Sequence, residues 1–318
     1  MPVNRGNTEE VLFTIESGDS AEIIIQNLKD KDLIKNFDTA LEYSKRKNLS
    51  FYPNTFSLNK SMKTSRIMDI ISKIESNLTS AKLVIFEGNS ALKTAEQIEE
   101  ITDGEIKAKD MLKLWKDKSF LQTQIDNYWF LTDQILSDEI LFPLEGYLSA
   151  STYEIPRGTT PEKITTQILN ATDLMLSPYE GVTPPNGYTL HDMLSLASII
   201  ERETKTKEDK YIVSGVFYNR LNLDMLLQSD ITVLYAMQEH KELVTFKDLE
   251  IDSPFNTYLY KGLTPGPIAS PSIEAIDAAF NPSTTDYLYF FATQDTGEVI
   301  YTKTYEEHLI VAEENAWQ

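Results

Sequence analysis

The stretch Leu194-Ser-Leu-Ala-Ser-Ile-Ile-Glu201-Arg-Glu203 places two glutamates at the end of an almost wholly apolar helix. At about 100° per residue, Glu201 falls on the apolar stripe of Leu190 and Leu194, and Glu203 falls beside Ile200. A carboxyl held against an apolar wall loses hydration, which disfavours its charged form. A carboxylic acid that stays protonated near neutral pH can act as a general acid. The pattern therefore indicates a catalytic carboxyl; the alternative is an ordinary helix end at which both glutamates reach solvent.

The composition describes an acidic globular protein. The chain has 318 residues, of which 41% are hydrophobic and 10% aromatic. This is enough for a real core and for about one to three domains. Because 49 acidic residues face 29 basic ones, the net charge is −20. A nucleic-acid partner is not expected, since binding phosphates needs a basic surface.

Several kinds of site lack the residues that they need. There is no cysteine, which excludes disulfides, thiolate nucleophiles and cysteine metal sites. His191, His240 and His308 are far apart and form no H-E-x-x-H pair, and no glycine-rich phosphate loop is found. We therefore expect neither a metal nor another cofactor.

No membrane or export segment is visible in the sequence. No apolar run approaches the roughly 18–20 residues that span a bilayer. The first residues also lack the apolar segment of a signal peptide. The chain as given is therefore predicted to be soluble, and composition leaves open whether an anchor lies outside it.

The first hundred residues contain a weak internal repeat. Residues 13–28 and 83–98 each read as a short strand, a glycine turn, a serine N-cap and an amphipathic helix. Between them, residues 54–58 alternate like a strand and residues 65–72 read as a helix. Small β-α-β units of this kind resemble the LysM-like subdomain of cell-wall proteins. The alternative is an ordinary small α+β module with no ligand of its own.

The remaining sequence predicts more helices than strands. Residues 105–141 read as helical and mixed, and the helix that carries the glutamates begins at a capping-box variant of Thr189 and Asp192. The predicted class is α+β, with LysM-like modules before a mixed catalytic domain. The further predicted elements are a helix near 208–221, a helix over 272–280, and strands 287–292 and 299–302 joined by a turn at 295–297.

Four blocks of sequence follow one another in an order that carries a family resemblance. They closely resemble the YceG-like, or MltG-type, endolytic murein transglycosylases, and the likeness covers nearly the whole chain. It divides the chain into a LysM-like subdomain at 1–78 and a catalytic domain at 79–318, with a second LysM-like repeat near 81–101. The blocks are Leu144-Glu-Gly-Tyr-Leu-Ser-Ala-Ser-Thr-Tyr153; Leu196-Ala-Ser-Ile-Ile-Glu201-Arg-Glu203; Val216-Phe-Tyr-Asn219-Arg220-Leu with Leu227-Gln228-Ser-Asp230; and Ser253-Pro-Phe-Asn256-Thr-Tyr258 with Gly262-Leu-Thr-Pro-Gly-Pro267.

The resemblance implies an enzyme that cuts peptidoglycan strands between N-acetylmuramic acid and N-acetylglucosamine. Helical periodicity does not choose between the two glutamates, whereas the family motif implies that Glu201 is catalytic. A single carboxyl suffices, because it first protonates the glycosidic oxygen and then takes the proton of the C6 hydroxyl. The products are 1,6-anhydro ends.

The resemblance also implies a place in the cell and partners. The enzyme would act at the outer face of the bacterial cytoplasmic membrane, held by an amino-terminal transmembrane anchor that is not in this sequence. It would cooperate with peptidoglycan synthases and the elongation machinery.

Other polar side chains in and near the four blocks are candidates for binding the sugar. Amides suit hydroxyl and N-acetyl groups, tyrosines offer ring faces and hydroxyls, and an arginine suits a lactyl or peptide carboxylate. For each of them a structural role is the alternative. The candidates are Asn219, Arg220, Gln228, Asp230, Asn256, Tyr258, Tyr153, Tyr147, Tyr235 and Glu203.

Two departures from the family pattern bear on these expectations. Ser149-Ala-Ser151 stands where the family usually has Phe-Pro-Asp, and Ile231 stands where it has proline.

Two rival functions stay open as well. A water-using muramidase needs a second carboxylate, for which Glu203 or Asp230 are the candidates. A non-catalytic scaffold would bind the wall through its LysM-like part.

Overall fold

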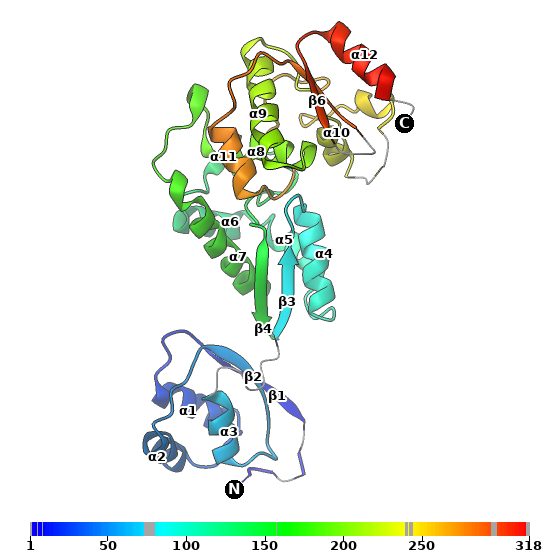
Figure 1. Cartoon of the computed structure of the whole chain (residues 1–318). Helices are drawn as coiled ribbons and strands as arrows, with labels where there is room; N and C mark the ends of the chain where they lie inside the picture. The colour runs from blue at the N-terminus through cyan, green and yellow to red at the C-terminus, as the bar shows by residue number, and fades with distance from the viewer. Residues whose placement is uncertain are drawn as a thin grey trace. The chain divides into compact units, whose positions relative to one another are not determined.

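Figure 1 shows the computed structural model of the chain, which divides into two compact units. The predicted boundary between residues 78 and 79 lies outside the described residues. The first unit comprises Met1–Leu83, Ile101–Glu105 and Tyr153–Thr160, and the second comprises Val84–Glu100, Ile106–Thr152 and Pro161–Gln318. The structure describes residues 2–4, 6–7, 9–72, 80–156, 158–238, 241, 244–293 and 298–315.

The first unit contains an antiparallel pair of strands, in which Phe13 lies opposite Phe56. Both side chains are buried, as are those of Ile15 and Leu58, so one face of this sheet carries the core. Apolar side chains of three helices complete that core. The predicted strand over 54–58 and helix over 65–72 are confirmed. The elements are β1 (Glu10–Ile15), α1 (Ala21–Asp30), α2 (Phe37–Lys47), β2 (Asn54–Asn59) and α3 (Thr64–Ile71).

The second copy of the predicted repeat folds as β3 (Ser80–Ile85) and α4 (Ala91–Ile101). Strand β3 pairs with β4 (Ser151–Pro156) in a two-stranded sheet, and the two lie side by side in Figure 1. The predicted serine caps are present, since Ser20 accepts from Ile23 N at 3.3 Å and Ser90 accepts from Lys93 N at 3.2 Å.

Helices make up most of the second unit. The predicted capping box of α8 is confirmed, because Thr189 N donates to Asp192 and Asp192 N donates back to Thr189. Helix α8 is buried over most of its length and packs against α9 and α11. A Cβ on Gly215 of α9 would lie 2.3 Å from Ser283 O, so only glycine permits this close approach. The helices are α5 (Ala108–Leu114), α6 (Lys118–Asn127), α7 (Pro161–Leu176), α8 (Leu190–Glu203), α9 (Lys207–Asn222), α10 (Asp230–Met237) and α11 (Ile273–Phe280), with short 3-10 turns at Asp133–Leu136, Ser177–Tyr179, Pro185–Gly187 and Asp248–Glu250.

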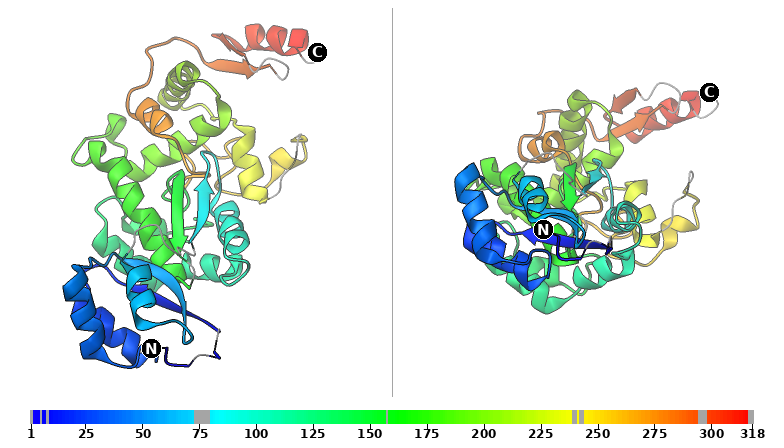
Figure 2. Two further views of the ribbon diagram at one scale, coloured as in Figure 1. Left: turned by 60° about the horizontal axis from the view of Figure 1, so that its bottom comes forward. Right: turned by 90° about the horizontal axis from the view of Figure 1, so that it is seen from below.

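The carboxy-terminal end of the chain is a hairpin with a helix. Strands β5 (Tyr289–Ala292) and β6 (Val299–Thr302) pair antiparallel, as predicted. The predicted turn at 295–297 lies outside the described residues. Helix α12 (Tyr305–Asn315) packs against both strands, as the red end of the ribbon in Figure 2 shows. In the part of the chain that the structure describes, no helix combines the length and apolarity needed to cross a bilayer.

A buried carboxyl fixes the start of α4. Glu145 is 2% exposed, and its Oε1 accepts a hydrogen bond of 2.8 Å from Ala91 N, in the first turn of α4. Burial raises the pKa of Glu145 to about 8, although the hydrogen bond from Ala91 acts in the opposite direction. Folding therefore favours the protonated form of this acid.

Replacing Glu145 with glutamine is expected to change how stability depends on pH. Because the pKa of Glu145 is raised by folding, its contribution to stability is complete at low pH and is lost as the pH rises toward about 8. At about pH 7 this loss amounts to about 3 kcal/mol. Glutamine keeps an acceptor for Ala91 N and has no proton to lose. The free energy of unfolding of Glu145→Gln should therefore rise relative to the parent between about pH 5 and about pH 8.

The measurement is chemical denaturation of both proteins across that pH range. The matched control is the same substitution at the exposed Glu139. A difference from the parent that does not vary with pH for Glu145→Gln would contradict the expectation.

Candidate active site

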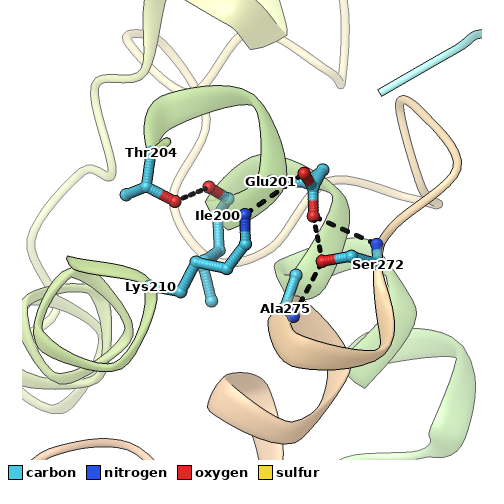
Figure 3. A network of polar contacts seen from close by, with 6 residues as sticks. All are labelled: Ile200, Glu201, Thr204, Lys210, Ser272 and Ala275. Atoms are coloured by element: carbon cyan, nitrogen blue, oxygen red, sulfur yellow. Dashed lines mark hydrogen bonds and ion pairs between the residues drawn. The ribbon is translucent and has the colours of Figure 1, made fainter. Parts of the chain in front are cut away.

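Glu201 lies in the last turn of α8, where its side chain is only 9% exposed. Figure 3 shows both carboxyl oxygens in contact with polar groups. Oε1 accepts from Lys210 Nζ at 3.2 Å. Oε2 accepts from Ser272 N at 3.0 Å and also from the Ser272 hydroxyl. The alternative that both glutamates simply reach solvent is therefore wrong for Glu201.

Three helix ends meet at this carboxyl. Lys210 lies in the first turns of α9 and is itself only 8% exposed. Ser272 is the N-cap of α11, since its hydroxyl accepts from Ala275 N at 3.2 Å. The start of a helix carries partial positive charge, so the N-terminus of α11 and the Lys210 ammonium both place positive charge next to the Glu201 carboxyl. The apolar helix buries the carboxyl, and these two groups compensate its lost hydration.

A second carboxyl, that of Glu87, lies near Glu201, and the sequence did not indicate it. Gly88 N donates to Ser270 O, and Ser270 N donates to Asn89 O, both at 2.8 Å. This pairing fixes the turn after β3 next to the segment that holds Glu201, and Glu87 directly precedes it. Burial raises the pKa of Glu87, and the negative charges of Glu201 and Glu274 raise it further. No local pattern in the sequence indicates that residues 87 and 201 come together.

Glu203 faces a different group of residues. Its Oε1 accepts from the Ser229 hydroxyl at 2.5 Å. Burial raises the pKa of Glu203, and the charge of Asp230 acts in the same direction, while the hydrogen bond from Ser229 lowers it. Glu203 thus belongs with the loop that precedes α10.

That loop holds Gln228 in an unusual backbone conformation. Gln228 is exposed and has φ 50°, which is the left-handed region, and such a residue costs about 1–2 kcal/mol outside glycine. Its N–H donates to Thr257 O at 3.1 Å, which fixes the position. Two residues later, Asp230 accepts from the Tyr258 hydroxyl at 2.5 Å. The structure therefore brings Gln228, Asp230, Tyr258 and Glu203 together, and strain of this kind often marks a functional site.

Three other predicted binding residues have their donors engaged inside the protein. Asn256 is fully buried, and Arg220 is 6% exposed. The hydrogen bonds of these three residues give them the structural role that was the alternative to binding sugar. A contact of these residues with sugar stays a prediction. Asn219 Nδ2 donates to Thr285 O and Tyr287 O, Arg220 donates to Leu288 O and Leu227 O, and Asn256 Nδ2 donates to Leu249 O and Ile251 O.

The remaining predicted tyrosines are buried. Tyr147 has no exposed surface, and its hydroxyl lies 2.7 Å from Nδ1 of His191. Tyr153 is 4% exposed in β4, and Tyr235 is 8% exposed in α10. Rings in such positions serve the core, although Tyr235 also lines a cavity together with Arg202 and Ile231. A contact of these tyrosines with sugar stays a prediction.

Comparison with known proteins finds the family that the four blocks resemble. The model of the YceG-like family matches residues 13–314. A protein of Bacillus subtilis (strain 168) named endolytic murein transglycosylase is 37% identical over 312 residues, which cover 96% of this chain and 85% of that protein. A protein of the same name from Streptococcus pneumoniae serotype 2 is 32% identical over 327 residues, which cover 97% of this chain and 59% of that protein.

A solved structure has the same fold. The crystal structure of a putative YceG-like protein from Listeria monocytogenes superimposes with a TM-score of 0.70 at 37% sequence identity, and the match covers 95% of this chain and 99% of that one. Since the family model spans most of the chain and a relative above 30% identity is covered over most of its length, this chain belongs to the YceG-like family.

Proposed function

We propose that this protein is an endolytic murein transglycosylase, which cleaves the bond between N-acetylmuramic acid and N-acetylglucosamine within peptidoglycan strands. Family membership and the names of the relatives support the general activity. The observation that carries the proposal is the nearly buried carboxyl of Glu201, held by Lys210 and Ser272 at the meeting point of three helices.

In the first step Glu201 acts as a general acid. Its proton passes to the glycosidic oxygen while the bond from that oxygen to C1 of the muramic acid breaks, and N-acetylglucosamine leaves with a free hydroxyl. The glutamate is left as a carboxylate. Lys210 and the N-terminus of α11 stabilise that charge, because they face both of its oxygens.

In the second step the same carboxylate acts as a base. It takes the proton of the C6 hydroxyl of the muramic acid as O6 bonds to C1, which closes the 1,6-anhydro ring. The proton lost in the first step is regained, and no water is consumed. Since the nucleophile belongs to the substrate itself, it is already present at high effective concentration.

In this proposal the loop before α10 binds the sugar. Gln228 is exposed, and its amide has both a donor and an acceptor for hydroxyl and N-acetyl groups. The loop itself is held by hydrogen bonds of the residues that follow Gln228, from Ser229 to Glu203 and from Tyr258 to Asp230. The loop therefore positions the substrate, while Glu201 performs the proton transfers.

The remaining parts of the proposal concern the setting of the enzyme. The order of β1, α1, α2 and β2 in the first unit supports a LysM-like module. We place the protein at the outer face of the cytoplasmic membrane, held by an amino-terminal anchor and working with peptidoglycan synthases.

A second candidate function is hydrolysis by the same site. A water-using muramidase needs a second carboxylate that activates water, and Glu87 is the group whose charge interacts with that of Glu201. The two reactions differ in their products, because a transglycosylase leaves anhydro ends and a muramidase leaves reducing ends.

Replacing Glu201 with glutamine is expected to lower the cleavage rate by at least about a thousandfold, because glutamine transfers no proton. The measurement is release of soluble fragments from peptidoglycan, with mass spectrometry of the ends made by the parent. Glu87→Gln is the matched control. It should keep a substantial part of the activity of the transglycosylase and remove that of a muramidase. Cleavage by Glu201→Gln at the parent rate would refute the role of Glu201.

Removing the hydroxyl of Ser272 is expected to lower kcat by about ten- to a hundredfold, since a hydrogen bond to a charged group contributes about 1.5–3 kcal/mol. Ser272→Ala also removes a helix cap, so Ser20→Ala serves as the control. It removes the N-cap of α1, at which the Ser20 hydroxyl accepts from Ile23 N. Both variants should lose similar stability in thermal unfolding, but only Ser272→Ala should lose activity. Equal activity of the two variants would show that Ser272 acts only as a cap.

A further inference from the structure

A cavity of about 490 Å³ in the second unit is not used by the proposed proton transfers. It is open to solvent on one side and is lined by the turn after β3, the start of α4, the end of α8 and one side of α10. Part of its wall is apolar, from Ile231, Leu234 and Ile268. The polar part includes the side chains of Lys93 and Arg202.

The polar part of the wall has an excess of positive charge in a protein whose net charge is −20. Lys93 is 59% exposed and lies 3.8 Å from Glu96, which also lines the cavity. Arg202 is exposed, and its Nη1 donates to Gly88 O at 3.2 Å, which holds the guanidinium at the cavity. The cavity lining therefore contains two cationic side chains and one carboxylate, and this excess of positive charge favours a ligand that carries negative charge.

The cavity adjoins the candidate active site along two segments of the chain. Arg202 directly follows Glu201, and Gly88 directly follows Glu87. The backbone bonds between Gly88, Asn89 and Ser270 hold these segments next to the one that binds Glu201. A sugar whose C1 lies at Glu201 would therefore have its neighbouring substituents within reach of the cavity.

We propose that this cavity binds the peptide attached through the lactyl group to the muramic acid at Glu201. The inference rests on the proposed function, because that function places muramic acid at this carboxyl. The peptide carries carboxylates that suit Lys93 and Arg202, and small side chains that suit the apolar wall. The same assignment moves carboxylate recognition from Arg220, which is buried and donates to two backbone carbonyls, to Arg202, which is exposed.

The test compares two substrates, intact glycan strands and strands whose peptides an amidase has removed. In the parent, kcat/KM should be higher for the intact strands. The double variant Lys93→Ala/Arg202→Ala should lower kcat/KM for intact strands by about tenfold, since each exposed charge pair contributes up to about 1 kcal/mol. It should change kcat/KM for peptide-free strands by less than about twofold. Lys118→Ala, at an exposed lysine of α6, is the matched control and should change neither value.

A binding measurement separates this inference from the catalytic proposal. Isothermal titration of Glu201→Gln with a soluble disaccharide-peptide should give tighter binding than titration with the peptide-free disaccharide. The substitutions at residues 93 and 202 should abolish that difference. Equal losses for both ligands would assign the cavity to the sugar, and no loss for either would leave it without a substrate; both results overturn the inference. Failure of the parent to cut any strand would refute the proposed function, while the titration would still decide the role of the cavity.

Discussion

The contact on which the site depends is that between the Glu201 carboxyl and the two groups that face it, the Lys210 ammonium and the N-terminus of α11. Burying a carboxyl in an apolar helix end is unfavourable unless hydrogen bonds and charge replace the lost water. Here both oxygens accept hydrogen bonds, one from Lys210 of α9 and the other from Ser272 at the start of α11. The packing of α8, α9 and α11 therefore fixes the position of the carboxyl, and one buried group links the core to the proposed chemistry.

Two further connections build a substrate-sized site around this contact. The backbone bonds between residues 88–89 and Ser270 bring Glu87 and the start of α4 to the end of α8. The contacts of Thr257 with the loop before α10 hold Gln228 in its left-handed conformation. The first connection brings charged side chains and a cavity next to Glu201. The second holds the loop that carries the exposed amide of Gln228. Both use backbone groups, so the arrangement does not depend on long, flexible side chains.

Much of the fold could be predicted from local pattern. The capped helices α1, α4 and α8 and the strands of the terminal hairpin follow from serine or threonine caps and from periodicity. Helix α7 was not predicted, although Pro161 at its start and the spacing of Ile164 and Ile168 are typical helix signals. Helix α2 was not predicted either, although Phe37, Ala40 and Leu41 follow helical spacing and pack in or against the core. Helix α10 could not be found in this way, because it is apolar on all sides and shows no amphipathic period.

The sequence by itself determined that a carboxyl would end a buried helix, and the family motif selected Glu201 from the two candidates. These conclusions need only helical geometry and the order of neighbouring residues. The tertiary structure decided which polar side chains remain available: the donors of Asn219, Arg220 and Asn256 are engaged with backbone carbonyls. It also brought Glu87 and Lys210 to Glu201, which no local pattern indicated. Hydrogen-bond partners from distant segments meet only when the chain packs, and a sequence pattern cannot contain that information.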